Sequence, residues 1–465
     1  MRFLFSCVPY LQTEVTTVKT SSLSIRDYLK FIIPSLIGVF LFMIPITVGD
    51  KVTIPVALLA GWIQDLLGDG LPALATALLF LSVIGSLVAK FVKPGFIQRS
   101  EFLTNLFDVT PMWLTVRILG SLFAIMVFFK IGPDYIISEY TGHLVLFDLV
   151  ALLFSIFLFA GLLLPLLLNF GLLELCGALL TKIMRPLFTL PGRSSIDCMA
   201  SWMGDGTIGV LLTNKQYQEG FYTKREAAVI GTTFSVVSIT FTITVLSYAG
   251  LEHLFLPYYL TIVVAGFVAA LIMPRIPPLS RKKDEHAPGI EPQKEAEVPE
   301  GRNLLSWGTE LAALRAQRTR FSEILTGGLK NVLDMWLGVV PVVMAFGTLA
   351  LVVAENTPVF QWLGAPFVPL LTLMQVPEAS AAAQSMVVGF ADMLLPVLLA
   401  EGIQSELTLF VIACVSVTQL IYMSEVGGLL LGSKLPVNFK DLVLIFLLRT
   451  LITLPVIVLM AHLLL

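Results

Sequence analysis

The sequence predicts an all-α integral membrane protein with about nine transmembrane helices and two re-entrant hairpins arranged as an inverted repeat. Three observations lead to this fold class: the composition, the number of long apolar stretches, and two short segments that resemble each other. Of the 465 residues, 57% are hydrophobic and 13% are charged, and the mean hydropathy is +0.90. Soluble domains carry about 25% charged residues, so the composition excludes an ordinary soluble protein.

The apolar stretches set the number of membrane spans. Crossing the hydrocarbon core takes about 20 residues of helix. Nine stretches are of about that length: 29–48, 71–92, 112–130, 144–170, 225–248, 255–273, 332–354, 407–422 and 442–462. A shorter stretch, 52–67, ends in Gln64 and Asp65 and could be a tenth span or a partial one. Keeping the N-terminus in the cytoplasm requires that it does not cross.

Two short segments of the chain echo each other. PLFTLPGRSSIDCMASWMGDG at 186–206 has a counterpart in PLLTLMQVPEASAAAQSMVVGFAD at 369–392. The parts at 193–212 and 378–400 are too short and too polar to cross the membrane, so we expect both to be re-entrant hairpins. Irregular backbone at membrane depth must be enclosed by protein or face water. Transporters built from structural repeats use such hairpins, one from each half, to bind the solute near the midplane.

Charge gives the domain organisation and the orientation. We expect an N-terminal transmembrane region at 1–143, a first repeat at 144–273, a charged cytoplasmic linker at 274–322 and a second repeat at 323–465. Lys and Arg flank the first hairpin and crowd the linker, whereas none occurs between Asn331 and Ser433. Positive residues mark the cytoplasmic side, so the first hairpin opens inward and the second outward. These features predict a multi-pass protein of the inner, cytoplasmic membrane.

The first hairpin and the helix after it carry one group of candidate site residues. The candidate substrate-binding residues here are Ser195, Asp205, Thr207, Ser235 and Ser238. Asp205 lies between two glycines, and an intramembrane carboxylate is costly and usually functional. Ser195 could instead cap a helix. The hydroxyls of Ser235 and Ser238 share one helix face and could serve only helix packing.

The second hairpin and its following helix supply the other group. Its candidates for the solute are Gln384, Ser385, Asp392 and Gln419, and Asp205, Asp392 and Glu425 are candidates for a coupling ion. Asp392 occupies the place in the second segment that Asp205 occupies in the first. Glu425 could alternatively lie at the cytoplasmic interface, where a charge costs little.

Several activities are excluded by missing motifs. The chain has no phosphate-binding Gly loop with Lys, no His-Glu-x-x-His pair and no nucleophile elbow. Its four Cys and four His are scattered, which argues against a metal centre. We therefore expect no enzymatic activity, no cofactor beyond a sodium ion or proton, and no nucleic-acid partner.

The residues at 194–241 and 389–428 resemble a known group of membrane proteins. They are similar to proteins with a nucleoside-recognition Gate domain, in particular the YjiH-like branch, and more distantly to concentrative nucleoside transporters. The resemblance implies an ion-coupled secondary transporter of a small polar solute, with a nucleoside as one candidate. The Gln-Thr-Glu cluster of the nucleoside transporters is absent, and the nearest polar sequence is Gly-Asp-Gly-Thr at 204–207. The alternative is a membrane scaffold acting in assembly or signalling, as a homo-oligomer or with a second Gate protein.

Overall fold

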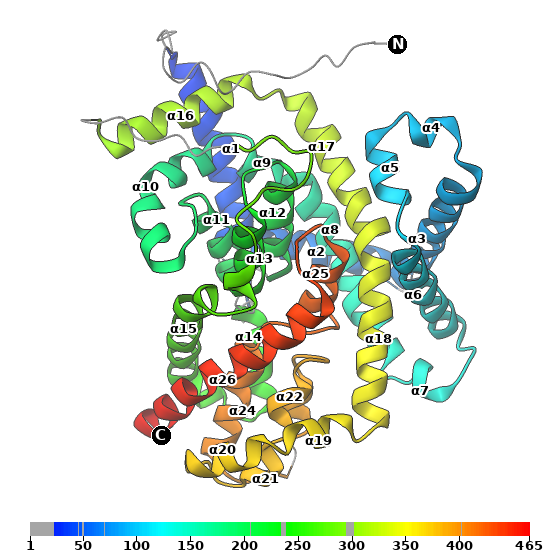
Figure 1. The fold of residues 1–465 in the computed structure, drawn as a ribbon, viewed down its shortest axis with the longest axis vertical. Coiled ribbons are helices and arrows are strands. Elements are labelled where there is room, and N and C mark those ends of the chain that lie inside the picture. Colours follow the sequence, from blue (N-terminus) through cyan, green and yellow to red (C-terminus); the bar gives the residue numbers. More distant parts are fainter. Residues whose placement is uncertain are drawn as a thin grey trace.

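The computed structural model describes residues 23–44, 46–48, 51–68, 70–204, 206–233, 239–293, 302–400 and 402–465. Over this part of the chain the protein is almost entirely helical (Figure 1), which confirms the predicted fold class. One small sheet is present among the described residues. It is an antiparallel hairpin of β1 (Ile46–Val48) and β2 (Lys51–Thr53).

The helices of the N-terminal region are spread over the molecule. They are α1 (Ile25–Met43), α2 (Pro55–Leu67), α3 (Gly70–Leu87) with a π-helical end (Val88–Val92), α4 (Gly95–Gln98), α5 (Glu101–Phe107), α6 (Pro111–Phe129) and α7 (Asp134–Ile137). Of these, α3 to α7 lie together at one side, whereas α1 lies beside α16 (Leu304–Arg318) at the other (Figure 1). Proline at the first position starts α2 and α6 without losing a hydrogen bond. Gly120 of α6 lets this helix approach α18 closely, since a Cβ there would lie 2.1 Å from the carbonyl oxygen of Pro341.

The segment expected to form the first repeat runs from a π-helical turn at Leu144–Val150 to α15. Its helices are α8 (Ala151–Leu163), α9 (Pro165–Leu168), α10 (Leu172–Phe188), α11 (Ser194–Met199), a π-helical turn (Ala200–Gly204), α12 (Gly206–Gln218), α13 (Lys224–Thr233), α14 (Ile239–Tyr248), a 3₁₀ turn (Glu252–Leu254) and α15 (Phe255–Ile272). Two further 3₁₀ turns follow, Met273–Arg275 and Leu279–Arg281. The predicted first hairpin corresponds to α11 and α12, and its second arm continues six residues past the expected end at 212.

The segment expected to form the second repeat follows the linker, part of which is helical. The helices are α16 (Leu304–Arg318), α17 (Phe321–Asp334), a π-helical turn (Met335–Val339), α18 (Val340–Asn356), α19 (Val359–Gly364), α20 (Phe367–Leu373), α21 (Ala379–Ala382), α22 (Ser385–Val388), α23 (Leu395–Leu398), α24 (Glu406–Thr418), α25 (Val426–Gly432) and α26 (Phe439–Leu464). The second hairpin comprises α21 to α23, which are single turns. The α16 helix packs against α10 and α1.

Six helices of the described chain are long and apolar enough to cross a membrane. They are Gly70–Val92, Pro111–Phe129, Leu144–Leu168, Phe255–Arg281, Ile324–Asn356 and Phe439–Leu464. The other three expected spans are not among these six. The first, α1, carries Arg26, Asp27 and Lys30 near its start. Of the second, the structure describes α13 and α14, and the third stops at Thr418. The stretch at 52–67 is the 13-residue α2, which packs against α8.

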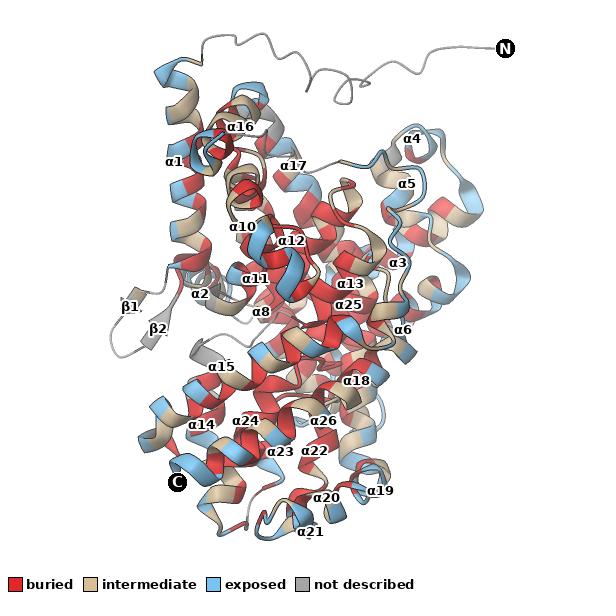
Figure 2. Ribbon diagram, turned by 60° about the vertical axis from the view of Figure 1, so that its left-hand side comes forward, coloured by how far each residue is buried: buried red, intermediate tan, exposed pale blue. Residues whose placement is uncertain are grey.

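The most buried helices lie in the interior of the molecule. Buried residues dominate α8, α12 and α24, while α1 and α3 at the periphery expose apolar faces (Figure 2). Ile33 and Leu36 of α1 and Phe80 of α3 are examples of exposed apolar side chains. Such faces suit contact with lipid, whose tails are as apolar as these side chains. The polar groups described below are therefore enclosed by protein rather than by water.

We expect Lys283→Cys and Asn356→Cys to react with a membrane-impermeant maleimide from opposite sides of the membrane. Lysine and arginine crowd the region around position 283 and are absent around position 356. Both positions are exposed. The measurement is labelling of each variant, in a cysteine-free background, in intact cells and in inverted vesicles. Labelling from the same side would contradict the inverted arrangement of the repeats.

Candidate functional site

The segment between α24 and α25 leaves the helical path inside the protein. Leu420 has a φ of +67°, a left-handed conformation that is uncommon for a residue with a side chain. The amides of Met423 and Ser424 donate to the carbonyl oxygens of Phe390 (2.8 Å) and Ala391 (3.1 Å) in the second hairpin. The interrupted helix and the hairpin are thus joined through their backbones.

Tyr422 supplies partners for the backbone groups released by this interruption. Its hydroxyl accepts from the Leu420 amide at 3.1 Å and lies 2.9 Å from the carbonyl oxygens of both Ser416 and Val417, to which it can donate. The side chain is buried. Unpaired backbone groups in an apolar interior cost several kcal/mol, so this hydroxyl stabilises the interruption.

Arg449 of α26 connects α24 with α13. Its Nε donates to the carbonyl oxygen of Thr418, the last residue of α24. Its Nη1 donates at 2.6 Å to the carbonyl oxygen of Thr233 in α13. The side chain is fully buried. A cation at a helix C-terminus offsets the partial negative charge of the unpaired carbonyls, so the guanidinium stabilises the end of α24.

Gln419 connects the interruption to the second hairpin and to α26. Its Nε2 donates to the carbonyl oxygen of Met386 at 2.6 Å and to Thr450 Oγ1 at 3.0 Å. Its Oε1 is buried and has no hydrogen-bond partner in the described chain. This oxygen lies against Gly389, where an added Cβ would be 2.0 Å from it. The site therefore contains one enclosed acceptor that has no donor among the described residues.

Asp392 of the second hairpin has a partner for each carboxylate oxygen. Its Oδ1 accepts from the Leu394 amide at 2.8 Å, which turns the chain into α23, and its Oδ2 accepts from Ser424 Oγ at 2.7 Å. Asp392 thus makes a second link between the hairpin and the helix interruption. Glu425, which directly precedes α25, is half-buried beside it.

The first hairpin contains a separate polar network around Asp197. This fully buried carboxylate accepts from Gln216 Nε2 at 2.7 Å and from Thr213 Oγ1 at 3.1 Å. Gln216 Nε2 also lies 2.9 Å from the Tyr222 hydroxyl, and Gln216 Oε1 is buried without a hydrogen-bond partner in the described chain. The two arms of the first hairpin are held together through this carboxylate.

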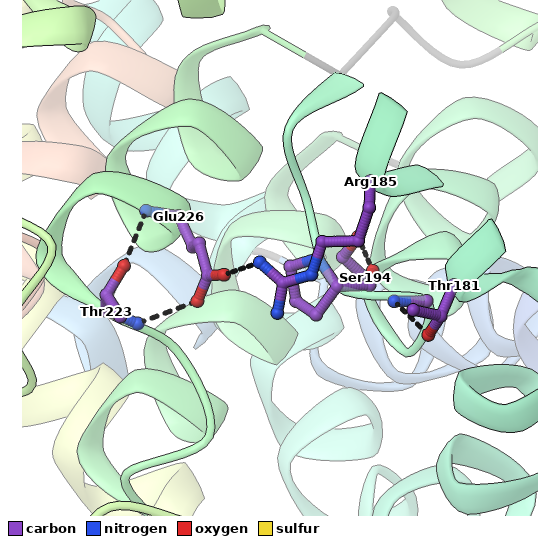
Figure 3. Close-up of polar contacts among 7 residues, drawn as sticks. Thr181, Arg185, Ser194, Thr223 and Glu226 are labelled. Atoms are coloured by element: carbon purple, nitrogen blue, oxygen red, sulfur yellow. Dashed lines mark hydrogen bonds and ion pairs between the residues drawn. The ribbon is translucent and has the colours of Figure 1, made fainter. Parts of the chain in front are cut away.

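Contacts with the neighbouring helices α10 and α13 hold the start of the first hairpin in place (Figure 3). Arg185 Nη1 lies 2.6 Å from Glu226 Oε1, and the other oxygen of Glu226 accepts from the Thr223 amide at 3.0 Å. Thr223 Oγ1 in turn accepts from the Glu226 amide at 3.2 Å, so the pair forms a capping box at the start of α13. Thr181 Oγ1 accepts from the Gly192 amide at 3.2 Å, and Ser194 Oγ donates to the carbonyl oxygen of Pro191 at 2.6 Å.

The structure brings together part of the predicted site. Asp392 and Gln419 both lie where the second hairpin meets the interruption, and Ser385 donates within the hairpin to the carbonyl oxygen of Pro396 at 2.9 Å. Gln384 is half-buried and lies next to Gly364 of α19.

In the first hairpin, Thr207 is buried in the first turn of α12. Ser195 Oγ is buried and has no hydrogen-bond partner in the described chain, so the expected capping role of this hydroxyl is not seen. Asp205, Ser235 and Ser238 lie outside the described residues.

Sequence reasoning missed Arg449, Tyr422 and the role of Asp197 as a central acceptor. A usable signal existed for Arg449, because it is the single Lys or Arg in the apolar stretch 442–462. An ionisable residue inside a span is by default a functional candidate. No comparable signal existed for Tyr422, since its partners are backbone atoms released only by the tertiary structure.

Comparison with known proteins gives three findings. A family model described as Gate, nucleoside recognition, matches residues 150–252, which confirms the Gate resemblance. The chain is 55% identical over 445 residues to an uncharacterised protein of Alkalihalophilus pseudofirmus, covering 96% of each chain. It also resembles a solved structure of a doubly substituted CNTnw in an outward-facing state, over 94% of this chain and 97% of that one. That likeness has 16% identity and a TM-score of 0.39.

We expect Asp392→Ala to lower the free energy of unfolding by about 2 kcal/mol, since it leaves Ser424 Oγ and the Leu394 amide without their acceptor. Asp392→Asn keeps one acceptor oxygen and offers an amide to Ser424, so it should lose less than about 1 kcal/mol. The measurement is thermal unfolding in detergent, with Asp65→Ala on the exposed face of α2 as the control. Equal loss in the alanine and asparagine variants would contradict the hydrogen-bonding role.

Proposed function

This chain belongs to the same family as the Alkalihalophilus pseudofirmus protein and carries a Gate domain, and we propose that it is a secondary, ion-coupled transporter of a small polar solute. The proposed location is the cytoplasmic membrane. The observation that carries the proposal is the convergence of the second hairpin on the interruption after Thr418. Discontinuous helices of this kind form the solute and ion sites of transporters near the midplane of the membrane.

The chemistry of the solute follows from the enclosed groups that have no partner. Three such oxygens are the Oε1 atoms of Gln419 and Gln216 and the Oγ of Ser195. Two are amide acceptors and one is a hydroxyl, and an unsatisfied buried acceptor costs about 1–3 kcal/mol. These groups favour a neutral solute that presents several hydroxyl or amine donors. A nucleoside has this chemistry, and the description of the matched Gate domain supports it.

Coupling requires a group that can bind and release a proton or a sodium ion during transport. We propose Asp392, Glu425 and Asp205 as the candidates, because carboxylates inside membrane proteins mark proton and ion pathways. Asp392 already links the hairpin to the interrupted helix through Ser424 and Leu394. A change in its charge would therefore alter the contacts that hold the hairpin.

We expect Ser195→Ala to raise the KM for uptake by about tenfold, the effect of one lost hydrogen bond to the solute, with thermal stability unchanged. The neighbouring Ser194→Ala is the matched control, because Ser194 Oγ already donates to the Pro191 carbonyl oxygen. That control should lower stability and leave KM nearly unchanged. The measurement is uptake of radiolabelled nucleosides into proteoliposomes, after a thermal-shift screen with nucleosides, dipeptides and organic acids.

Two outcomes would count against this function. Equal effects of the two serine substitutions on KM would remove Ser195 from the solute site. A folded protein that neither transports nor is stabilised by any of these solutes, but co-purifies with a second Gate-domain protein, would favour the scaffold alternative.

We expect Asp392→Asn to abolish the dependence of uptake on an imposed pH or sodium gradient, while the variant remains folded. Asparagine keeps an acceptor for the Leu394 amide but carries neither charge nor a titrating proton. The measurement compares uptake with and without the gradient. Coupling that survives unchanged in the variant would assign the role to another carboxylate.

A further inference from the structure

The end of α3 leads into a lobe, residues 88–107, that presents large apolar side chains at its surface. Lys93 adopts a left-handed conformation with a φ of +50°, and the helical path stops there. Around this turn Phe91 is 75% exposed, Val92 69% and Phe96 66%. A contiguous group of exposed apolar side chains marks a contact with a partner or with the membrane.

The lobe is held in shape from within. Ile97 and Leu106 are buried, and Arg117 of α6 donates to the carbonyl oxygen of Leu106 at 2.9 Å. Phe107 lies against Gly85 of α3, where an added Cβ would be 2.3 Å from the ring. Because α5 folds back onto α3 in this way, the outward position of the exposed side chains is fixed.

The lobe is also basic. Its charged residues are three basic ones and one acid: Lys90, Lys93, Arg99 and Glu101. Lys93 and Arg99 are exposed. A further cation comes from α17, since Lys330 Nζ lies 5.9 Å from the ring centre of Phe102. Positive charge and apolar surface thus occur together on this part of the protein.

The lobe lies where a membrane span ends. The span Gly70–Val92 ends within it, and in both Figure 1 and Figure 2 α4 and α5 lie at the same end of the molecule as α16. The α16 helix belongs to the charged linker that we expect in the cytoplasm, the side that Lys and Arg mark. Anionic lipids give the cytoplasmic leaflet a negative surface that attracts basic residues close to the membrane.

We propose that this lobe binds an anionic phospholipid of the cytoplasmic leaflet. The three exposed apolar side chains contact the acyl chains, and Lys93 and Arg99 bind the phosphate of the headgroup. A surface that combines apolar and basic side chains binds at the membrane interface, and its affinity increases with the anionic charge of the lipid. This binding does not depend on the proposed transport function.

We expect phosphatidylglycerol to raise the thermal midpoint of the full-length protein in detergent by about 3 °C more than an equal mole fraction of phosphatidylcholine. Lys93→Gln should lower this difference, and Lys93→Gln with Arg99→Gln should lower it by at least about half. Added salt should reduce it too, because exposed charges are screened. An equal effect of the two lipids on the wild type, or an unchanged difference in the double variant, would overturn the proposal.

Lys130→Gln is the matched control. Lys130 ends α6 in the same left-handed conformation, with a φ of +54°, and lies between exposed Phe129 and Ile131. It has no basic neighbours in the sequence, because it is the single Lys or Arg in residues 118–181. This variant should keep the full difference between the two lipids. A loss as large as that of Lys93→Gln would indicate a general effect of charge and overturn the proposal.

Two further measurements identify what the lobe contacts. In liposomes, the fluorescence that Phe96→Trp adds to that of the native tryptophans should be quenched more by brominated phosphatidylglycerol than by brominated phosphatidylcholine. Phe80→Trp, exposed in the middle of α3, should be quenched equally by both, and equal quenching at both positions would overturn the proposal. Glycerol 1-phosphate, the free headgroup, should not stabilise the protein. Stabilisation by it equal to that of the lipid would assign the basic residues to a soluble phosphate compound instead.

Discussion

The structure depends on finding partners for backbone groups where helices stop inside an apolar protein. Each helix end leaves several carbonyl groups unpaired, and an apolar surrounding offers no water to bind them. Arg449 donates to carbonyls of α24 and α13 with one buried side chain. Because one of these carbonyls is the end of α24, the position of the interrupted helix is defined relative to α13 through α26. The remaining polar contacts of the site are arranged around this junction.

The second hairpin and the interruption after Thr418 form one unit. Backbone pairing of Met423 with Phe390, the Asp392–Ser424 contact and the Gln419–Met386 contact join them at three points. The first hairpin is organised differently. Its central contacts, from Asp197 to Thr213 and Gln216, are internal to the hairpin. A ligand at Gln419 would therefore act on the hairpin and on the divided helix together, whereas one at Gln216 would act first on a single hairpin.

The sequence predicted those features that follow from the cost of polar groups in a membrane. The helical class could be predicted, and so could the need of Asp392 and Gln419 for polar partners, because a carboxylate or amide in an apolar run needs a partner. The division at Thr418 could not, since no glycine or proline marks it and Leu420 adopts a left-handed conformation that only tertiary contacts explain. Ser385 appeared to be a candidate ligand, yet its hydroxyl serves the hairpin backbone. Chemical type alone cannot separate these two uses of a serine.

Arg449 shows why the sequences of the two hairpins alone could not predict the whole site. The residue lies beyond both hairpins in the sequence, and its acceptors are backbone atoms 216 and 31 positions away. Neither acceptor could be recognised in the sequence, because both are backbone carbonyl oxygens and every residue has one. Only the charge could have indicated the role, since a guanidinium inside an apolar span must be compensated by groups elsewhere in the protein. A lone arginine in a span thus indicates polar partners elsewhere in the protein, and the location of those partners must come from the structure.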